Sequence, residues 1–118
     1  MSAGSAVTTH VLDTARGRPA AGVPVRLERV SDAGPEELGR ASTDPDGRVR
    51  AIGPPRLDPG TYRLVFGTAE YFARPDQPGP RTAFFPEVAV TFTADGAAPH
   101  YHVPLLLSPF GYATYRGS

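Results

Sequence analysis

The sequence predicts an all-β protein, an antiparallel β-sandwich or barrel with one short helix. Thirteen glycines and fourteen prolines are spread through the 118 residues, and they recur at the short intervals typical of strands joined by turns. Between them lie short segments in which apolar and polar residues alternate. Because no apolar stripe at helical spacing continues for about ten residues, no long amphipathic helix is expected.

Eight segments have the alternation and the composition expected of strands. In chain order they are Val7–Asp13, Val23–Glu28, Glu37–Thr43, Arg48–Ile52, Tyr62–Phe66, Val88–Thr93, Tyr101–Leu107 and Tyr112–Arg116. The clearest connection is the turn Asp44-Pro45-Asp46-Gly47, in which proline suits the second position of a type I turn and glycine accepts a positive φ. Arg16–Pro19 is also expected to be a turn.

One short helix is expected between the fifth and sixth strands. Thr68 can cap this helix, Ala69–Ala73 can form it, and Pro75 limits its length. The next stretch, Asp76–Arg81, is rich in proline and glycine and is expected to be an exposed loop. The chain length predicts a single domain over residues 1–118, with residues 1–5 disordered.

The composition argues against several classes of partner. Twelve basic and twelve acidic residues cancel, and no block of like charge offers a footprint for nucleic acid or an anionic membrane. The absence of cysteine excludes disulfides, thiolate metal sites and cysteine nucleophiles. The first residues lack the features of a signal peptide, and no apolar run approaches ~18 residues. We therefore expect a cytoplasmic protein without nucleic-acid or membrane partners.

Two of the three histidines are expected to point away from the core. In the first strand, the two-residue period places His10 on one face with Thr8 and Leu12. In the seventh strand, His102 and Leu106 share a face. The opposite face is the better core face, with Tyr101, Val103, Leu105 and Leu107. Leucines beside outward histidines suggest a second contact surface, such as a subunit interface.

Each polar candidate also has a purely structural interpretation. A lone strand histidine is more often a bystander, and this interpretation is kept for His100. Arg48 is either a surface arginine or a fixed guanidinium, whose planar fork suits the carbonyls and acidic nitrogens of a purine-derived ring. The His-x-His pair could be part of a metal site, but the sequence has no HExxH motif and nothing locates a carboxylate beside the pair. A serine triad lacks its Gly-x-Ser-x-Gly turn.

Three separated segments resemble the 5-hydroxyisourate hydrolases, the enzymatic branch of the transthyretin-like family. They are Thr8–Asp13 continued through Gly17–Ala20 to Val23–Val25, then Thr43–Arg48, and the tail His100–Ser118, with Phe84–Glu87 as a shorter fourth match. Together they span nearly the whole chain in the family order. The sequence departs from the family pattern at Ala113, where serine is more usual, and in a long proline-rich loop, Arg74–Thr82.

The resemblance implies an eight-stranded sandwich of two four-stranded sheets, assembled as a homotetramer with active sites in the channel between dimers. It assigns catalytic roles to His10, Arg48 and His102. It also implies that the tail lines the same site and contacts the substrate through Tyr115, Arg116, Gly117 and Ser118. Tyr115 is expected to face the channel, and Gly117 is expected to permit a close backbone approach.

The reaction implied by the resemblance is the hydrolysis of 5-hydroxyisourate during urate breakdown. Water opens the six-membered ring at an amide-like carbonyl and gives 2-oxo-4-hydroxy-4-carboxy-5-ureidoimidazoline. A histidine pKa of ~6.5 suits both proton transfers, and which histidine is the base stays open. Arg48 would orient the ring and stabilise the developing negative charge. No metal or organic cofactor is expected.

Two other functions are compatible with a β-sandwich. A non-catalytic small-ligand carrier of the transthyretin type would share the fold, but the hormone carriers lack the set of His10, Arg48, His102 and a terminal Tyr-Arg-Gly-Ser. An adhesion or interaction module would have neither a channel nor a catalytic set. The polar residues, rather than the fold, separate these functions.

Overall fold

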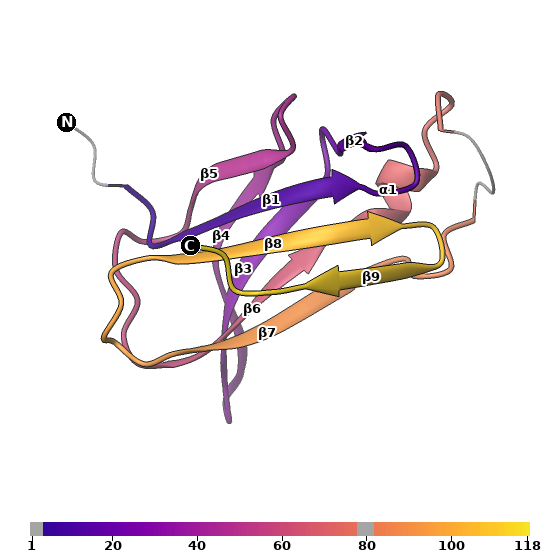
Figure 1. Ribbon diagram of the computed structural model, residues 1–118. Coiled ribbons are helices and arrows are strands. Elements are labelled where there is room, and N and C mark those ends of the chain that lie inside the picture. Colours follow the sequence, from indigo (N-terminus) through magenta and orange to yellow (C-terminus); the bar gives the residue numbers. More distant parts are fainter. Residues whose placement is uncertain (1–3, 78–81) are drawn as a thin grey trace.

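The computed structural model describes residues 4–77 and 82–118, which form two stacked β-sheets and one short helix (Figure 1). The elements in chain order are β1 (Val7–Asp13), β2 (Arg18–Pro19), β3 (Pro24–Ser31), β4 (Gly34–Ser42), β5 (Arg48–Ile52), β6 (Gly60–Phe66), α1 (Thr68–Phe72), β7 (Val88–Ala94), β8 (Tyr101–Ser108) and β9 (Gly111–Thr114). The predicted all-β sandwich with one short helix is confirmed.

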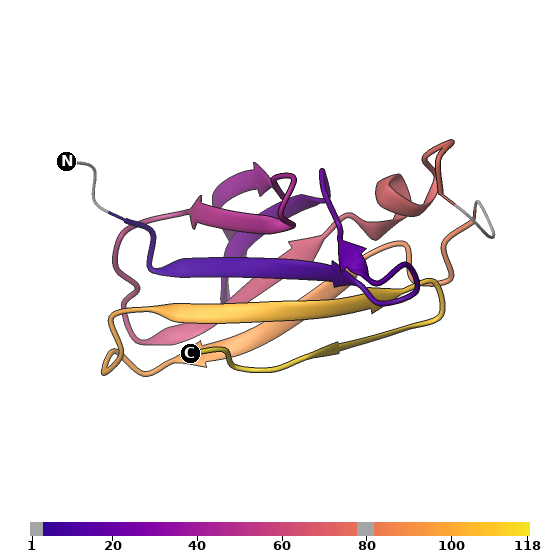
Figure 2. The ribbon, with the colours of Figure 1, turned by 45° about the horizontal axis from the view of Figure 1, so that its top comes forward.

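The two layers are visible edge-on in Figure 2. One sheet has the order β4-β3-β6-β7, and the other has the order β2-β1-β8-β9 with β5 also paired to β1. The second sheet therefore holds five strands rather than four, because part of the expected turn, Arg18–Pro19, pairs with the end of β1. In addition, β1 and β8 run parallel, whereas an antiparallel sandwich was predicted. Between β1 and β8 in the sequence, the chain forms the strands of the other sheet, and such a crossover connection permits parallel pairing.

The strand limits differ from the prediction mainly where polar residues continue a hairpin. β1 and β5 have the predicted limits, whereas β3 and β4 extend to a tight connection in which Ser31 pairs with Gly34. A register shift after Leu27 interrupts the alternation of β3, so the sequence pattern ends before the strand does. β9 ends at Thr114, two residues before the predicted limit, and the chain then turns toward β8.

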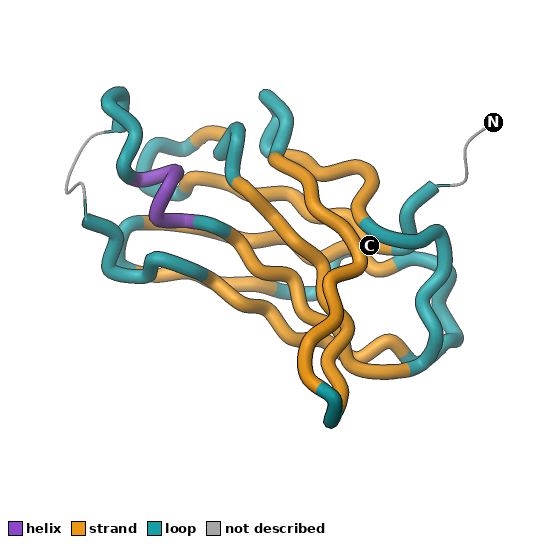
Figure 3. Tube along the Cα trace, turned by 180° about the vertical axis from the view of Figure 1, so that it is seen from behind, coloured by secondary structure: helices purple, strands orange, loops and turns teal. Residues whose placement is uncertain are grey.

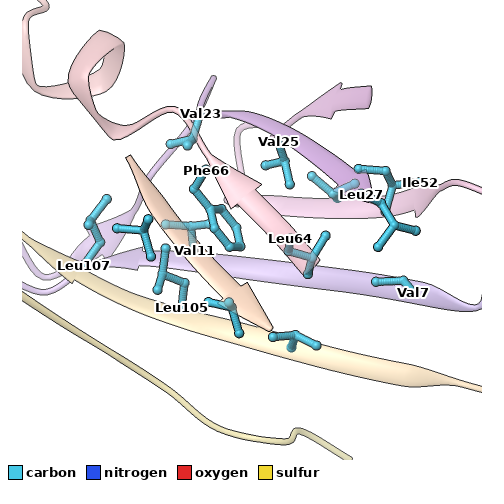
Figure 4. Packing of buried hydrophobic residues seen from close by; sticks show 14 of the residues in the cluster. Val7, Val11, Val23, Val25, Leu27, Ile52, Leu64, Phe66, Leu105 and Leu107 are labelled. Atoms are coloured by element: carbon cyan, nitrogen blue, oxygen red, sulfur yellow. The ribbon is translucent and has the colours of Figure 1, made fainter. Parts of the chain in front are cut away.

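The core lies between the two sheets (Figure 4). The odd-numbered residues of β1 and β8 point inward and meet side chains from the opposite sheet, as the two-residue period predicted. The main contributors are Val7, Val11, Leu105 and Leu107 from one sheet and Val25, Leu27, Leu64 and Phe66 from the other. Each buried side chain of this size stabilises the fold by about 1.5–3 kcal/mol. The same alternation leaves His10 and His102 half-buried on the outer face of the sheet.

Helix α1 lies at one end of the sandwich (Figure 3). The prediction that Thr68 caps this helix is wrong, because its buried hydroxyl donates a hydrogen bond to the carbonyl of Phe85 and Gly67 occupies the cap position. The amide of Ala69 is satisfied by the carbonyl of Pro86 instead (2.9 Å). No helix within residues 4–77 and 82–118 is long and apolar enough to cross a membrane.

Two predictions of irregular structure fall partly outside the described residues. Residues 1–3 of the segment expected to be disordered lie outside them, and so do residues 78–81 of the expected loop. Ser5 is not disordered, because its hydroxyl accepts a hydrogen bond from the amide of Ile52 (3.0 Å). Gln77 is buried, although its loop was expected to be exposed.

Candidate active site

The three predicted catalytic residues come from three adjacent strands of one sheet. β1 lies between β5 and β8, so its outward residues have neighbours on both sides (Figure 1). His10 is directly opposite Arg48 on β5, and Thr8 is directly opposite His102 on β8. The strand register therefore brings together residues that are far apart in the sequence.

The turn before β5 fixes the ring of His10. Its Nε2 lies 3.0 Å from the carbonyl oxygen of Asp46. Because a carbonyl oxygen only accepts hydrogen bonds, this nitrogen must carry a proton and donate it. Asp44 shapes the turn by accepting hydrogen bonds from the amides of Arg48 and Asp46, both at 2.9 Å. The amide of Arg48, together with that of Asp46, holds the pKa of the Asp44 carboxyl below its usual value.

Arg48 is the half-buried cation of the site. The neighbouring Arg50 forms ion pairs with Asp44 (3.5 Å) and Asp46 (3.7 Å). Among the ion pairs formed by residues 4–77 and 82–118, none involves Arg48. Its guanidinium charge is therefore not matched by a carboxylate side chain there, and it can act on a bound anion or a polarised carbonyl.

His102 is held by a threonine hydroxyl that also contacts a second histidine. Its Nδ1 lies 2.8 Å from Oγ1 of Thr8, and the same Oγ1 lies 3.0 Å from Nε2 of His100. Burial lowers the pKa of His102 below its ordinary value, and the nearby charges of Arg48, His100 and His10 lower this pKa further. His102 is therefore a neutral imidazole near pH 7.

The tail is divided between two hollows that share His102. Ser118 lines an open hollow of about 380 Å³ together with Thr8, Arg48 and His100. Tyr115 and Arg116 instead line a neighbouring hollow of about 250 Å³, between β7 and β8. The guanidinium of Arg116 lies over the ring of Tyr101, 5.5 Å from its centroid.

Gly117 joins the tail to His102. Its amide donates a hydrogen bond to the carbonyl of His102 (2.8 Å), and its Cα lies against the imidazole ring. A Cβ at this position would overlap Cδ2 of His102 and would also lie 3.2 Å from Cγ of Pro104. Gly117 thus makes the close approach that was expected of it.

Sequence reasoning treated His100 as a bystander and gave Thr8 no role. The structure places Thr8 in contact with both His102 and His100, and these contacts depend on the pairing of β1 with β8. Across the described parts of the chain, no group of three or more histidine, aspartate or glutamate side chains is arranged to hold a metal ion.

The site combines a neutral imidazole and a guanidinium at the edge of one hollow. Nε2 of His102 makes no hydrogen bond within residues 4–77 and 82–118, so it is available to accept a proton. Arg48 can stabilise negative charge that develops nearby. This is the arrangement needed to activate water for attack on a carbonyl group.

Comparison with known proteins is consistent with this geometry. A family model described as "HIUase/Transthyretin family" matches residues 7–117. The 5-hydroxyisourate hydrolase of Deinococcus radiodurans is 46% identical, with 100% of each chain covered. The structure of Klebsiella pneumoniae 5-hydroxyisourate hydrolase has a TM-score of 0.80 and 35% identity, covering 97% of this chain and 99% of that chain. Transthyretin from Sparus aurata has a TM-score of 0.82 and 28% identity, covering 95% and 96% respectively.

Proposed function

The chain belongs to the HIUase/transthyretin family, and we propose that it hydrolyses 5-hydroxyisourate in urate breakdown. The observation that carries this proposal is the convergence of His10, Arg48 and His102 from three adjacent strands. The backbone alone does not choose between enzyme and carrier, since the TM-scores to a hydrolase and to a transthyretin are 0.80 and 0.82. The polar set and the higher identity to the hydrolases favour the enzyme.

In the proposed mechanism, His102 is the general base. Its Nε2 removes a proton from water, and the water oxygen attacks the amide-like carbonyl carbon. Arg48 stabilises the oxyanion that forms. The carbon–nitrogen bond then breaks, the leaving nitrogen takes up the proton that Nε2 of His102 removed from water, and the carbonyl becomes the carboxyl group of the product, which releases its proton to solvent. His102 is taken as the base because it lines the same hollow as Arg48 and its Nε2 makes no hydrogen bond within residues 4–77 and 82–118, whereas Nε2 of His10 donates to Asp46.

The tail is proposed to bind the substrate from two sides of His102. Ser118 lies at the His102–Arg48 hollow, and Gly117 supports the imidazole ring from behind. Tyr115 and Arg116 lie at the adjacent hollow, from which an aromatic ring and a guanidinium can reach a planar ligand.

We also propose that the protein is a homotetramer with its sites in a channel between dimers. Leu12 and Leu106 are directly opposite each other on the outer face that carries the site. A second apolar surface is formed by Phe84 and Phe110, which are 66% and 68% exposed and lie within 6.2 Å of each other by ring centroid. Such surfaces usually mark contacts between chains. Light scattering should give about four times the 12.5 kDa chain mass, and an active monomer would refute this assembly.

A cytoplasmic location is part of the same proposal. It is supported by a cysteine-free composition, which is compatible with a reducing compartment. Cell fractionation with an antibody to the protein tests this location directly.

The activity is tested by adding the purified protein to freshly generated 5-hydroxyisourate and following the decay of its absorbance. We expect rapid decay with formation of the ring-opened product. Arg48→Lys should lose most of this activity, because a lysine lacks the planar fork of arginine. Arg56→Lys, a matched change outside the site, should behave like the unmodified protein. Decay no faster than in buffer would refute the proposed function.

A further inference from the structure

We propose that Thr8 and His100 are positioning residues that fix the proton of His102 on Nδ1 and leave Nε2 free to act as the base. This inference rests on the proposed function, because it concerns how the proposed base is prepared. It assigns roles to an exposed histidine and a threonine that the mechanism so far does not use. The observation behind it is one hydroxyl group placed between two imidazole rings.

The geometry links the three side chains in a chain of hydrogen bonds. Oγ1 of Thr8 lies 2.8 Å from Nδ1 of His102 and 3.0 Å from Nε2 of His100. A threonine hydroxyl has one hydrogen, so it can donate to only one of these nitrogens. The other ring must donate to the hydroxyl. The proton positions of the two histidines are therefore coupled through Thr8.

The hydroxyl oxygen of Thr8 can also accept from both rings, and a base at Nε2 needs an arrangement in which Nδ1–H of His102 donates to Thr8. If Thr8 donates to His100, then Nδ1–H of His102 donates to Thr8, and the lone pair of neutral His102 lies on Nε2. If Thr8 donates to His102, the proton of neutral His102 lies on Nε2, which then cannot accept one. After His102 accepts a proton, both of its nitrogens carry hydrogen, so Nδ1–H must donate to Thr8 in the charged ring as well.

His100 acts in this network as the final acceptor. It is exposed, whereas His102 is half-buried. Protonated His100 has no lone pair and can no longer accept the hydrogen of Thr8. The residues that line the hollows around His102 include the cations Arg48 and Arg50 from β5 and Arg116 from the tail. His10 from β1 also contributes charge near His102.

Thr8→Val tests the role of the hydroxyl, because valine has almost the same shape but cannot form hydrogen bonds. We expect kcat to fall by about 10- to 100-fold with little change in KM, since the base is misaligned while substrate contacts remain. Thr8→Ser, which keeps the hydroxyl, should retain the rate within about threefold. Circular dichroism serves as the folding control for each variant.

His100→Phe removes the final acceptor at an exposed position where folding is not at risk. We expect a loss of rate similar to that of Thr8→Val, and the double variant should be no slower than either single variant, because the two residues act as one unit. Full rates in folded Thr8→Val and His100→Phe would overturn the proposal.

The ¹⁵N chemical shifts of His102 report its tautomer independently of any turnover. We expect the neutral ring to carry its proton on Nδ1 in the unmodified protein and to lose this preference in Thr8→Val. A neutral His102 protonated on Nε2 in the unmodified protein would overturn the proposal, even if hydrolysis is confirmed. Lack of hydrolysis with the proton on Nδ1 would instead refute the proposed function and leave the hydrogen-bond network intact.

Discussion

The contact between the tail and His102 can be tested with the substitution Gly117→Ala, which adds one methyl group next to the imidazole ring. The new Cβ would overlap Cδ2 of the imidazole and approach Cγ of the same ring to 3.2 Å, inside the 3.4 Å at which ordinary contact begins. Backbone strain plays no part, because Gly117 is not among the glycines with positive φ. The effect is therefore purely steric.

The overlap can be relieved in two ways, and both disturb the site. If the imidazole moves, its ring must shift on the order of 1 Å, which disturbs its hydrogen bond with Thr8, and misplacement of this size typically costs about 100-fold in rate. If the tail lifts instead, it loses the hydrogen bond from Gly117 to His102, which costs about 0.5–1.5 kcal/mol, and it withdraws Ser118 from the hollow. Turnover should thus fall by about 100-fold, whereas the free energy of unfolding should change by less than about 1.5 kcal/mol.

The assay compares kcat/KM for 5-hydroxyisourate in Gly117→Ala and in Gly111→Ala. Gly111 is the matched control, because its added Cβ would meet only Ser108 Oγ at 3.7 Å, an ordinary contact. Urea denaturation of both variants measures stability. If folded Gly117→Ala retains the rate of the Gly111→Ala control, the close contact between tail and imidazole has no catalytic importance and the reasoning is wrong.

Three further predictions concern pH, the tail and the core. Because burial lowers the pKa of His102, the acidic midpoint of kcat/KM should lie below the ~6.5 of an unperturbed histidine, and a midpoint above ~6.5 in the pH–rate profile would contradict this assignment. Deleting residues 115–118 should abolish hydrolysis while circular dichroism still shows a folded sandwich, since these residues contribute no side chain to the buried core; a truncated protein with full activity would remove the tail from the site. Tyr71 donates a hydrogen bond to the buried Asp13 (2.6 Å), and burial raises the pKa of Tyr71 to about 12, so the phenol stays protonated. Tyr71→Phe should lower the free energy of unfolding by about 1–3 kcal/mol without changing kcat, and urea denaturation with an unchanged stability would show that the bond contributes nothing.

The orientation of the catalytic histidines could be predicted because it depends only on the local strand period. In β1 and β8 the core residues occupy alternate positions, so His10 and His102 had to lie on the outer face. The contact between Thr8 and His102 could not be predicted in the same way. It depends on the parallel register of two strands separated by more than 80 residues, and period-two alternation does not specify which strands pair.

The error at Thr68 has a similar origin, because a tertiary contact engages a side chain that the local sequence assigned to a helix cap. Thr68 has the side chain of a helix cap, but burial against the loop at Phe85 takes its hydroxyl elsewhere. The tail was expected to line the site, but the local pattern did not indicate that Ser118 and Tyr115 lie at two neighbouring hollows that share His102. The role of the tail in substrate binding stays a prediction.

The most direct test of the proposed site is the rate of 5-hydroxyisourate hydrolysis by His102→Asn compared with the unmodified protein. Asparagine keeps a polar side chain of similar reach but cannot serve as a base at neutral pH. Removal of the general base should lower kcat/KM by roughly 10²–10⁴-fold, with an unchanged circular dichroism spectrum. A folded His102→Asn protein that hydrolyses 5-hydroxyisourate at the full rate would contradict the assignment of His102 as the base.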